Sequence, residues 1–156
     1  MTLNAQLLTL NRGRETEMTE QKYDLEDRLL EYAALIVRLV EKLPNTRAGN
    51  HVAGQLLRSG TSPLPNHGEA EAAESRSDFI HKMGICHKEL RESRRWLRLI
   101  QRVPLLTDSA EVEKALKETD ELVRIFAASI RTARTNAKDG GMCREKSETY
   151  LTEEKV

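Results

Sequence analysis

Apolar residues recur at alternating steps of four and three along three stretches of the chain. In the first stretch, from Tyr23 to Leu43, this spacing places the apolar side chains on one face of a helix. The helix is predicted to end before Pro44, because proline has no N–H to donate and disfavours helical geometry in the residue before it. A polar connector is expected at 45–50. The stripe consists of Leu25, Leu29, Tyr32, Ile36, Leu39 and Leu43.

Two later stretches repeat the pattern, each after a capping signal. Ser75 with Asp78, and Asp108 with Glu111, resemble capping boxes that begin helices. Pro104 is predicted to close the first of these two helices. The two stripes are Phe79, Met83, Cys86, Leu90, Ser93, Leu97 and Ile100, and then Val112, Leu116, Thr119, Val123, Phe126, Ile130 and Ala133.

Between these stretches, residues 52–73 form a segment that is less regular. Gly60, Pro63 and Pro65 lie in its middle, which predicts either one helix kinked near Pro63 and Pro65 or two short helices. Helices with one apolar face must pack together, and short connectors favour neighbours that run in opposite directions. The sequence therefore predicts an all-α fold, an antiparallel up-and-down four-helix bundle.

Composition agrees with helices in a single domain. Of the 156 residues, 38% are hydrophobic and only 4% aromatic, which suits amphipathic helices better than strands. The bundle is expected to span 23–137, with flexible segments at 1–22 and 138–156 because these lack a sustained apolar period. Neither a signal peptide nor a membrane span is predicted, so we expect a cytoplasmic protein that makes no membrane contact.

The charges are balanced overall and unbalanced locally. Lys and Arg total 25, as do Asp and Glu, so no global field favours nucleic acid. Residues 75–107, however, carry eight Lys or Arg and three Asp or Glu, a net charge of +5. At about 100° per residue, five arginines fall on one strip opposite the core stripe. They are Arg91, Arg94, Arg95, Arg98 and Arg102.

Two interpretations of this arginine strip stay open. Guanidinium groups spaced by helical turns could follow a nucleic-acid backbone, which would make the strip a binding site for RNA or DNA. Alternatively, the strip is a solvated face, or a face that pairs with acidic residues of another subunit.

A subsidiary apolar strip lies between the arginines and the core stripe of the same helix. It consists of Ile85, Trp96, Leu99 and Val103. One interpretation is a subunit interface anchored by Trp96, because aromatic residues and arginine are enriched at interface centres. The other is a widened core stripe within one bundle.

No arrangement typical of catalysis or metal binding is found. Arg58, Asn66, Glu69 and Glu89 are expected to form a structural polar cluster, although a carboxylate inside a bundle could also act as an acid or base. No Glu-x-x-His motif, paired metal-ligand spacing or Gly-x-Ser-x-Gly elbow is present, and Cys86 and Cys143 share no ligand spacing. We therefore expect no enzymatic activity, no metal and no cofactor.

Residues 55–97 resemble a family of bacterial four-helix bundle proteins first noted as reading frames within intervening sequences of 23S rRNA genes. The matching features are Gln55, Leu56, Arg58, Thr61, Ser62, Asn66, Glu69, Ser75, Asp78, Phe79, Lys88, Glu89, Trp96 and Leu97. The resemblance extends over about residues 23–137 and implies a homopentamer without enzymatic activity or cofactor. A related branch, the accessory proteins of diversity-generating retroelements, is basic and binds a reverse transcriptase and nucleic acid, whereas this chain is charge-balanced.

These observations favour an oligomeric helical scaffold or adaptor that binds a protein partner. The oligomeric habit of the family favours the interface interpretation of the strip containing Trp96. The alternative is an accessory protein that binds RNA or DNA, alone or together with a reverse transcriptase, through the arginine strip.

Overall fold

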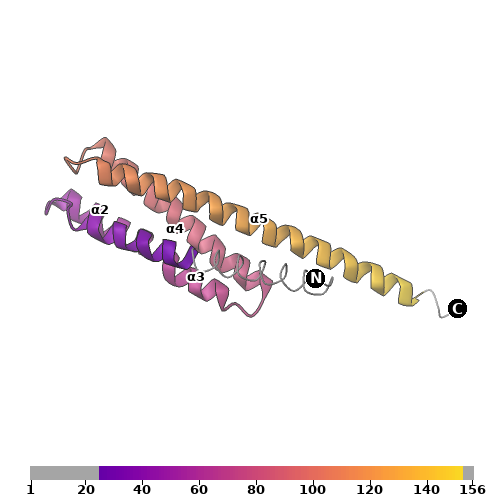
Figure 1. Ribbon diagram of the computed structural model, residues 1–156. Helices are drawn as coiled ribbons and strands as arrows, with labels where there is room; N and C mark the ends of the chain where they lie inside the picture. Colours follow the sequence, from indigo (N-terminus) through magenta and orange to yellow (C-terminus); the bar gives the residue numbers. More distant parts are fainter. Residues whose placement is uncertain (1–24, 153–156) are drawn as a thin grey trace, which may run out of the picture.

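The chain folds as an all-α bundle. The computed structural model describes the backbone of residues 25–152 and the side chains of 25–136. A first helix at 25–40 is followed by α2 (Arg47–Thr61), α3 (Pro63–Glu71), α4 (Arg76–Arg102) and α5 (Ala110–Thr152). Figure 1 shows the first helix, the pair α2 and α3, and the two long helices α4 and α5 lying alongside one another. The predicted all-α bundle is confirmed. The predicted segment 1–22 lies outside the described residues.

Ion pairs across the bundle give the relative direction of its helices. Arg28, near the start of the first helix, pairs with Glu118 of α5, and Lys42, just after its end, pairs with Glu111. Residue numbers therefore rise along the first helix as they fall along α5, so these two helices run in opposite directions. Pairs between α2–α3 and α4 show the same inversion.

The second helix of the bundle is divided at one residue. Ser62 joins α2 to α3 with helical backbone angles, φ −59° and ψ −35°. Its N–H donates to the carbonyl of Arg58 at 3.2 Å, and its carbonyl accepts from the N–H of Asn66 at 3.3 Å. Pro63 then opens α3, at a position where its missing N–H costs least. The interruption predicted near the prolines therefore lies directly before Pro63, with the helical path carried through it.

The start of α2 corrects the sequence prediction. The polar connector expected at 45–50 is wrong from Arg47 onward, where α2 already begins. Thr46 is the N-cap, and its hydroxyl oxygen accepts a hydrogen bond from the N–H of Gly49 at 3.0 Å. A Cβ on Gly49 would lie 2.0 Å from the carbonyl oxygen of Pro44, so only glycine fits this close approach. Residues that looked like a loop thus form the first turn of a helix.

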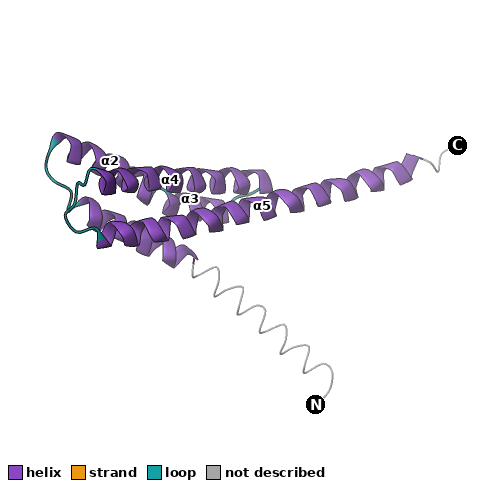
Figure 2. Cartoon of the chain, turned by 90° about the horizontal axis from the view of Figure 1, so that it is seen from above, coloured by secondary structure: helices purple, strands orange, loops and turns teal. Residues whose placement is uncertain are grey.

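The ends of α4 agree with the sequence prediction, whereas the end of α5 differs from it. The hydroxyl of Ser75 accepts from the N–H of Asp78 at 3.1 Å, which caps α4, and α4 ends at Arg102, before Pro104. The sequence placed the end of the bundle at 137, yet α5 continues to Thr152. Figure 2 shows this last part of α5 extending beyond the other helices. The apolar period stops where α5 leaves the bundle, and the helix itself goes on.

A layer of hydroxyl groups crosses the middle of the core. Tyr32, Ser59, Ser93 and Thr119 come from the first helix, α2, α4 and α5, and each is at most 1% exposed. Tyr32 Oη lies 2.9 Å from Thr119 Oγ1, and Ser93 Oγ donates to Ser59 Oγ at 2.9 Å. Apolar side chains such as Leu90, Leu97 and Phe126 fill the rest of the core. Each hydroxyl has a partner, as burial of polar groups requires.

Candidate nucleic-acid and subunit interfaces

The arginine strip predicted on α4 is exposed along its whole length. All five of its side chains are exposed to solvent: Arg91, Arg94, Arg95, Arg98 and Arg102. Arg94 Nε lies 2.9 Å from a carboxylate oxygen of Asp120 on α5, so this arginine is partly neutralised. For the other four, the described part of the chain supplies no ion pair. Four guanidinium groups therefore face outward with their charge available to a partner.

The neighbourhood of these arginines is positively charged and slightly hollowed. Arg95, Arg98 and Arg102 line a shallow concavity together with Leu99 and Gln101. One turn before Arg91, the pKa of His87 is lowered, first by partial burial and then by the charge of Arg91. An anion or a carboxylate-rich surface would be attracted to this arginine strip.

The subsidiary apolar strip of α4 is only partly covered by the bundle. Trp96 is half-buried, with its ring centroid 5.9 Å from that of His51 on α2 in an edge-to-face arrangement. Its indole N–H donates to Glu92 at 3.3 Å. Ile85 is also half-buried, whereas Leu99 and Val103 are 41% and 55% exposed. Trp96 therefore extends the packing between α2 and α4, whereas Leu99 and Val103 face outward.

The four residues predicted as one polar cluster occupy three separate places. Arg58 of α2 donates to Glu89 of α4 at 3.3 Å and also pairs with Glu92. Asn66 instead donates to the carbonyl and hydroxyl oxygens of Ser62, at 2.9 and 3.0 Å. These contacts hold the second helix of the bundle against α4 and stabilise its junction.

Glu69, the fourth residue of that predicted cluster, lies apart from the other three. It pairs with Lys82 of α4 rather than with Arg58. This hydrogen bond raises the pKa of Lys82. Glu69 and Glu89 thus face different partners and do not converge as an acid–base pair would.

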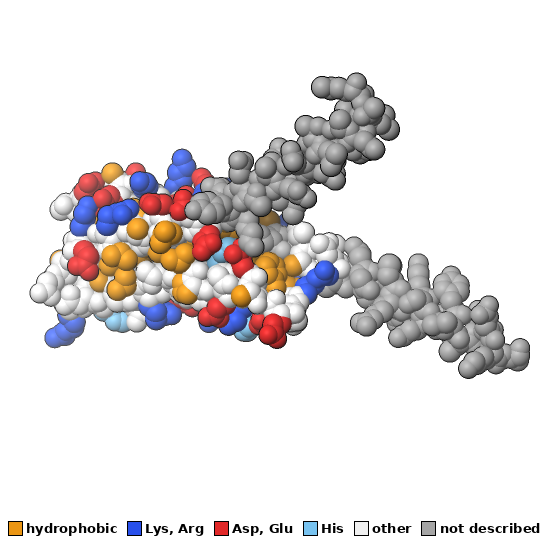
Figure 3. All heavy atoms as spheres, turned by 60° about the horizontal axis from the view of Figure 1, so that its bottom comes forward, with side chains coloured by type: hydrophobic (Ala, Val, Ile, Leu, Met, Phe, Trp, Pro, Cys, Tyr) orange, Lys and Arg blue, Asp and Glu red, His pale blue; other side chains and the backbone are white. Residues whose placement is uncertain are grey.

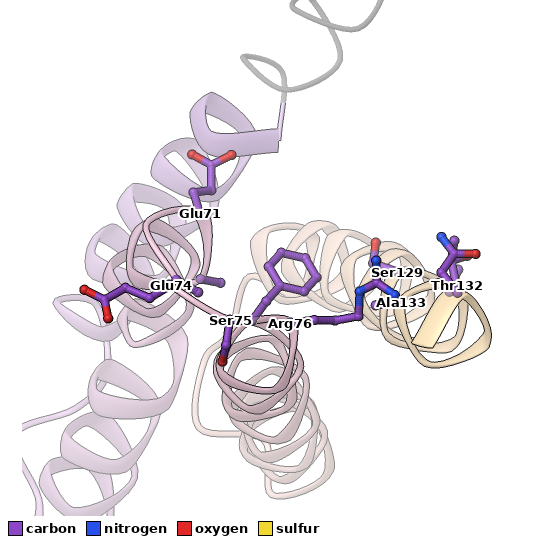
Figure 4. Close-up of a pocket in the computed structure, with 12 residues that line it drawn as sticks. Glu71, Glu74, Ser75, Arg76, Ser129, Thr132 and Ala133 are labelled. Carbon is purple, nitrogen blue, oxygen red and sulfur yellow. The ribbon is translucent and has the colours of Figure 1, made fainter. Parts of the chain in front are cut away.

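A cleft of about 850 Å³ lies where the turn between α3 and α4 faces α5. Figure 4 shows Arg76 reaching from the start of α4 toward Ser129 and Ala133 of α5, whereas Glu71 and Glu74 point away from the cleft. Its lining is mostly short side chains and contains no convergent set of carboxylates. The residues are Ala70, Glu71, Ala73, Glu74, Ser75, Arg76, Phe79, Ala128, Ser129, Thr132, Ala133 and Asn136.

Sequence analysis missed a second exposed apolar surface, which is formed by the first helix and α2. Leu30 and Val37 of the first helix are 51% and 41% exposed, and Leu57 of α2 is 39% exposed. Leu30 and Val37 are seven residues apart, a spacing that puts two side chains on one helical face. This spacing was present in the sequence, but it was obscured because the stronger core stripe runs along the same helix.

Two other kinds of site are absent from the described residues. No group of three or more His, Cys, Asp or Glu side chains in them is placed to hold a metal ion. The helices that the structure describes also include none with the length and hydropathy that crossing a bilayer requires.

Comparisons with known proteins identify relatives of the chain. The family model for the 23S rRNA-intervening sequence protein matches residues 21–128. A solved structure from the S23 ribosomal protein family, a protein of unknown function from Bacteroides thetaiotaomicron, is 37% identical with a TM-score of 0.62. That match covers 67% of this chain and 96% of the other. No curated protein matches. With this fold and these matches, the chain belongs to the 23S rRNA-intervening sequence protein family.

Proposed function

We propose that this protein is a non-enzymatic helical scaffold or adaptor that assembles from several copies and binds a protein partner in the cytoplasm. One observation carries the proposal: Leu99 and Val103 stand exposed on α4 beside the half-buried Trp96. An apolar strip next to arginines has the composition of an interface core. The resemblance to the bacterial family favours a pentamer.

Light scattering on the purified full chain tests the assembly. A monomer has a mass of 17.8 kDa, and we expect the weight-average mass to be a multiple of this value that stays constant over a wide dilution series. A mass near 17.8 kDa at every concentration would overturn the proposal. The measurement needs no ligand and no knowledge of the partner.

A second candidate function is the binding of RNA or DNA by α4. The observation that favours it is the set of four exposed arginines for which the described residues provide no ion pair: Arg91, Arg95, Arg98 and Arg102. Guanidinium groups on successive turns of one helix can contact successive phosphates. Because the charges of the whole chain are balanced, the attraction of nucleic acid is limited to the arginine strip itself.

Fluorescence anisotropy with a labelled RNA and a labelled DNA of mixed sequence distinguishes this candidate. Binding should weaken as the salt concentration rises. The slope of log K against log salt is negative, and each phosphate contact removed should make it shallower by about 1. Arg95→Ala and Arg98→Ala should each weaken binding, whereas Arg131→Ala, an exposed arginine of α5, should not. Absence of binding at low salt removes the candidate.

A further inference from the structure

We propose that copies of this chain assemble through a contact between two different surfaces, an acidic groove on one copy and the basic ridge of α4 on the next. The groove surface lies between the first helix and α2–α3 and comprises Glu26, Leu30, Val37, Glu41, Leu57 and Leu64. The ridge surface comprises Arg95, Arg98, Leu99, Arg102 and Val103. The inference rests on the proposed function, because it locates the two surfaces through which the copies in that assembly contact one another.

The groove surface is a continuous feature formed by two helices. Leu30 and Val37 share one face of the first helix, and Leu57 and Leu64 repeat the seven-residue spacing across α2 and α3. Leu30 and Leu64 line the same cleft of about 510 Å³, so the two apolar faces adjoin. Figure 3 shows hydrophobic side chains gathered in a band across the middle of one face of the molecule.

Acidic residues flank this groove. Glu26 lies one helical turn before Leu30, and Glu41 lies one turn after Val37. Asp27 joins Glu26 and Leu30 in the lining of the cleft. All three carboxylates are exposed, and no side chain in the described part of the chain forms an ion pair with them. The groove surface is therefore apolar along its centre and negative at its edge.

The ridge surface of α4 is the electrostatic counterpart of the groove. Leu99 and Val103 lie one turn apart, and Arg95, Arg98 and Arg102 are exposed beside them. From Arg95 to Arg102 is about 10 Å along the helix, the same as from Leu30 to Val37. Within the described residues, the five large hydrophobic side chains that are exposed all belong to these two surfaces: Leu30, Val37, Leu57, Leu99 and Val103.

Charge decides between unlike and like contacts. If two ridges met, arginines would face arginines, and if two grooves met, carboxylates would face carboxylates, which is unfavourable in both cases. A ridge against a groove pairs opposite charges and covers both apolar centres. The +5 charge of residues 75–107 and the −5 charge of the rest of the chain are balanced in every copy, so each copy offers both halves. Such a head-to-tail contact generates a ring when its rotation closes.

Two single substitutions test the pairing, because each disables one surface and leaves the other intact. Leu30→Lys places a cation in the acidic groove, where it would face arginines, and Val103→Glu places an anion on the ridge, where it would face carboxylates. Both positions are more than half exposed, at 51% and 55%, which protects the fold. Each variant alone should sediment as a monomer in analytical ultracentrifugation, with self-association weakened roughly tenfold or more. Circular dichroism confirms that each variant remains helical.

Mixing the two variants gives the decisive result. The ridge of Leu30→Lys and the groove of Val103→Glu are both unaltered, so an equimolar mixture should form complexes that contain both variants. Self-association of either variant alone as strong as that of the original chain, or a mixture that stays monomeric, overturns the pairing. Glu113→Gln and Lys117→Gln, which change the net charge equally at exposed sites of α5, should assemble like the original chain. If the original chain is itself a monomer, both the pairing and the proposed function are wrong. If the chain is an oligomer and neither substitution weakens its assembly, only the pairing is wrong.

Discussion

Tyr32 donates a hydrogen bond to Thr119 in the centre of the core, and this bond ties the first helix to α5. The two oxygens lie 2.9 Å apart. The direction follows from the other contact of Thr119, whose hydroxyl donates its single proton to the carbonyl of Ala115 at 2.6 Å. Thr119 can then only accept from Tyr32. Because both groups are fully buried, the bond is satisfied in only one register of the two helices, which a purely apolar stripe would specify less strictly.

Tyr32→Phe is expected to destabilise the fold by about 0.5–1.5 kcal/mol, the usual net value of a buried hydrogen bond. The ring volume is kept, so no cavity contributes to the loss. Urea denaturation at fixed protein concentration measures the effect, since assembly would make stability depend on concentration. Thr119→Ser keeps a hydroxyl at the same place and should lose less through this bond than Thr119→Val. A Tyr32→Phe variant as stable as the original chain would contradict the assigned bond.

Stability should fall in alkaline solution because of the same residue. Burial raises the pKa of Tyr32 from 10.0 to about 12, because the charged phenolate is poorly solvated in the core. Between these two values the unfolded chain loses the phenolic proton while the folded chain keeps it, so the free energy of unfolding decreases as pH rises. Below pH 10 the contribution is fully present.

The alkaline effect can be assigned by substitution. Burial also raises the pKa of Cys86, from 9.0 to about 12, so this thiol adds to the fall in stability. Urea denaturation across this pH range should therefore show a shallower decline for Tyr32→Phe and some remaining decline from Cys86. Equal slopes for Tyr32→Phe and the original chain would show that Tyr32 does not titrate as proposed.

The periodic helices could be predicted from sequence because their core faces repeat at helical spacing and their ends carry local signals. Ser75 and Pro104 bound α4 in the structure as the sequence predicts. The continuation of α5 to Thr152 could not be predicted in this way, because that part leaves the other helices and has no stripe to detect. Periodicity reports packing against a neighbour, and a helix can extend beyond its last neighbour.

The candidate surfaces were predictable only in part, and for a related reason. The arginine strip was found because charge contrasts with the opposite apolar face of α4. The groove was missed because Leu30 and Val37 belong to a helix whose Leu29, Ile36 and Leu39 are buried, and neighbouring apolar residues look like one wide stripe. Which of them the second helix covers depends on packing geometry. Likewise, whether Glu69 pairs with Arg58 or with Lys82 depends on register across the bundle, which spacing does not give.

Thr46→Ala should lower the free energy of unfolding by about 1 kcal/mol, because it removes the N-cap of α2. The hydroxyl of Thr46 accepts from the N–H of Gly49, and alanine leaves that donor without its partner. Ser75→Ala, which removes the equivalent cap of α4, should cost a similar amount. Thermal and urea denaturation measure both effects, and Thr46→Ser, which retains the capping oxygen, serves as the control. A loss for Thr46→Ser as large as that for Thr46→Ala would mean that the cap is not the cause.

Gly60→Ala and Gly54→Ala should change stability in opposite directions although both lie in α2. A Cβ on Gly60 would lie 2.7 Å from Cγ2 and 2.9 Å from Cγ1 of Ile36, so alanine would force the second helix away from the first, at a cost of about 1–3 kcal/mol. A Cβ on Gly54 would meet nothing within 4 Å, so alanine should stabilise the helix by roughly 0.5–1 kcal/mol.

The cause of the Gly60→Ala loss can be isolated with a double-mutant cycle. In an Ile36→Ala background, the Cγ1 and Cγ2 atoms that the new Cβ would approach too closely are absent, and Gly60→Ala should then cost much less than in the original chain. Urea denaturation of the four chains gives the coupling free energy between the two sites. A cost for Gly60→Ala that is the same in both backgrounds would place the conflict elsewhere than at Ile36, and the close approach of the first two helices of the bundle would then need another explanation.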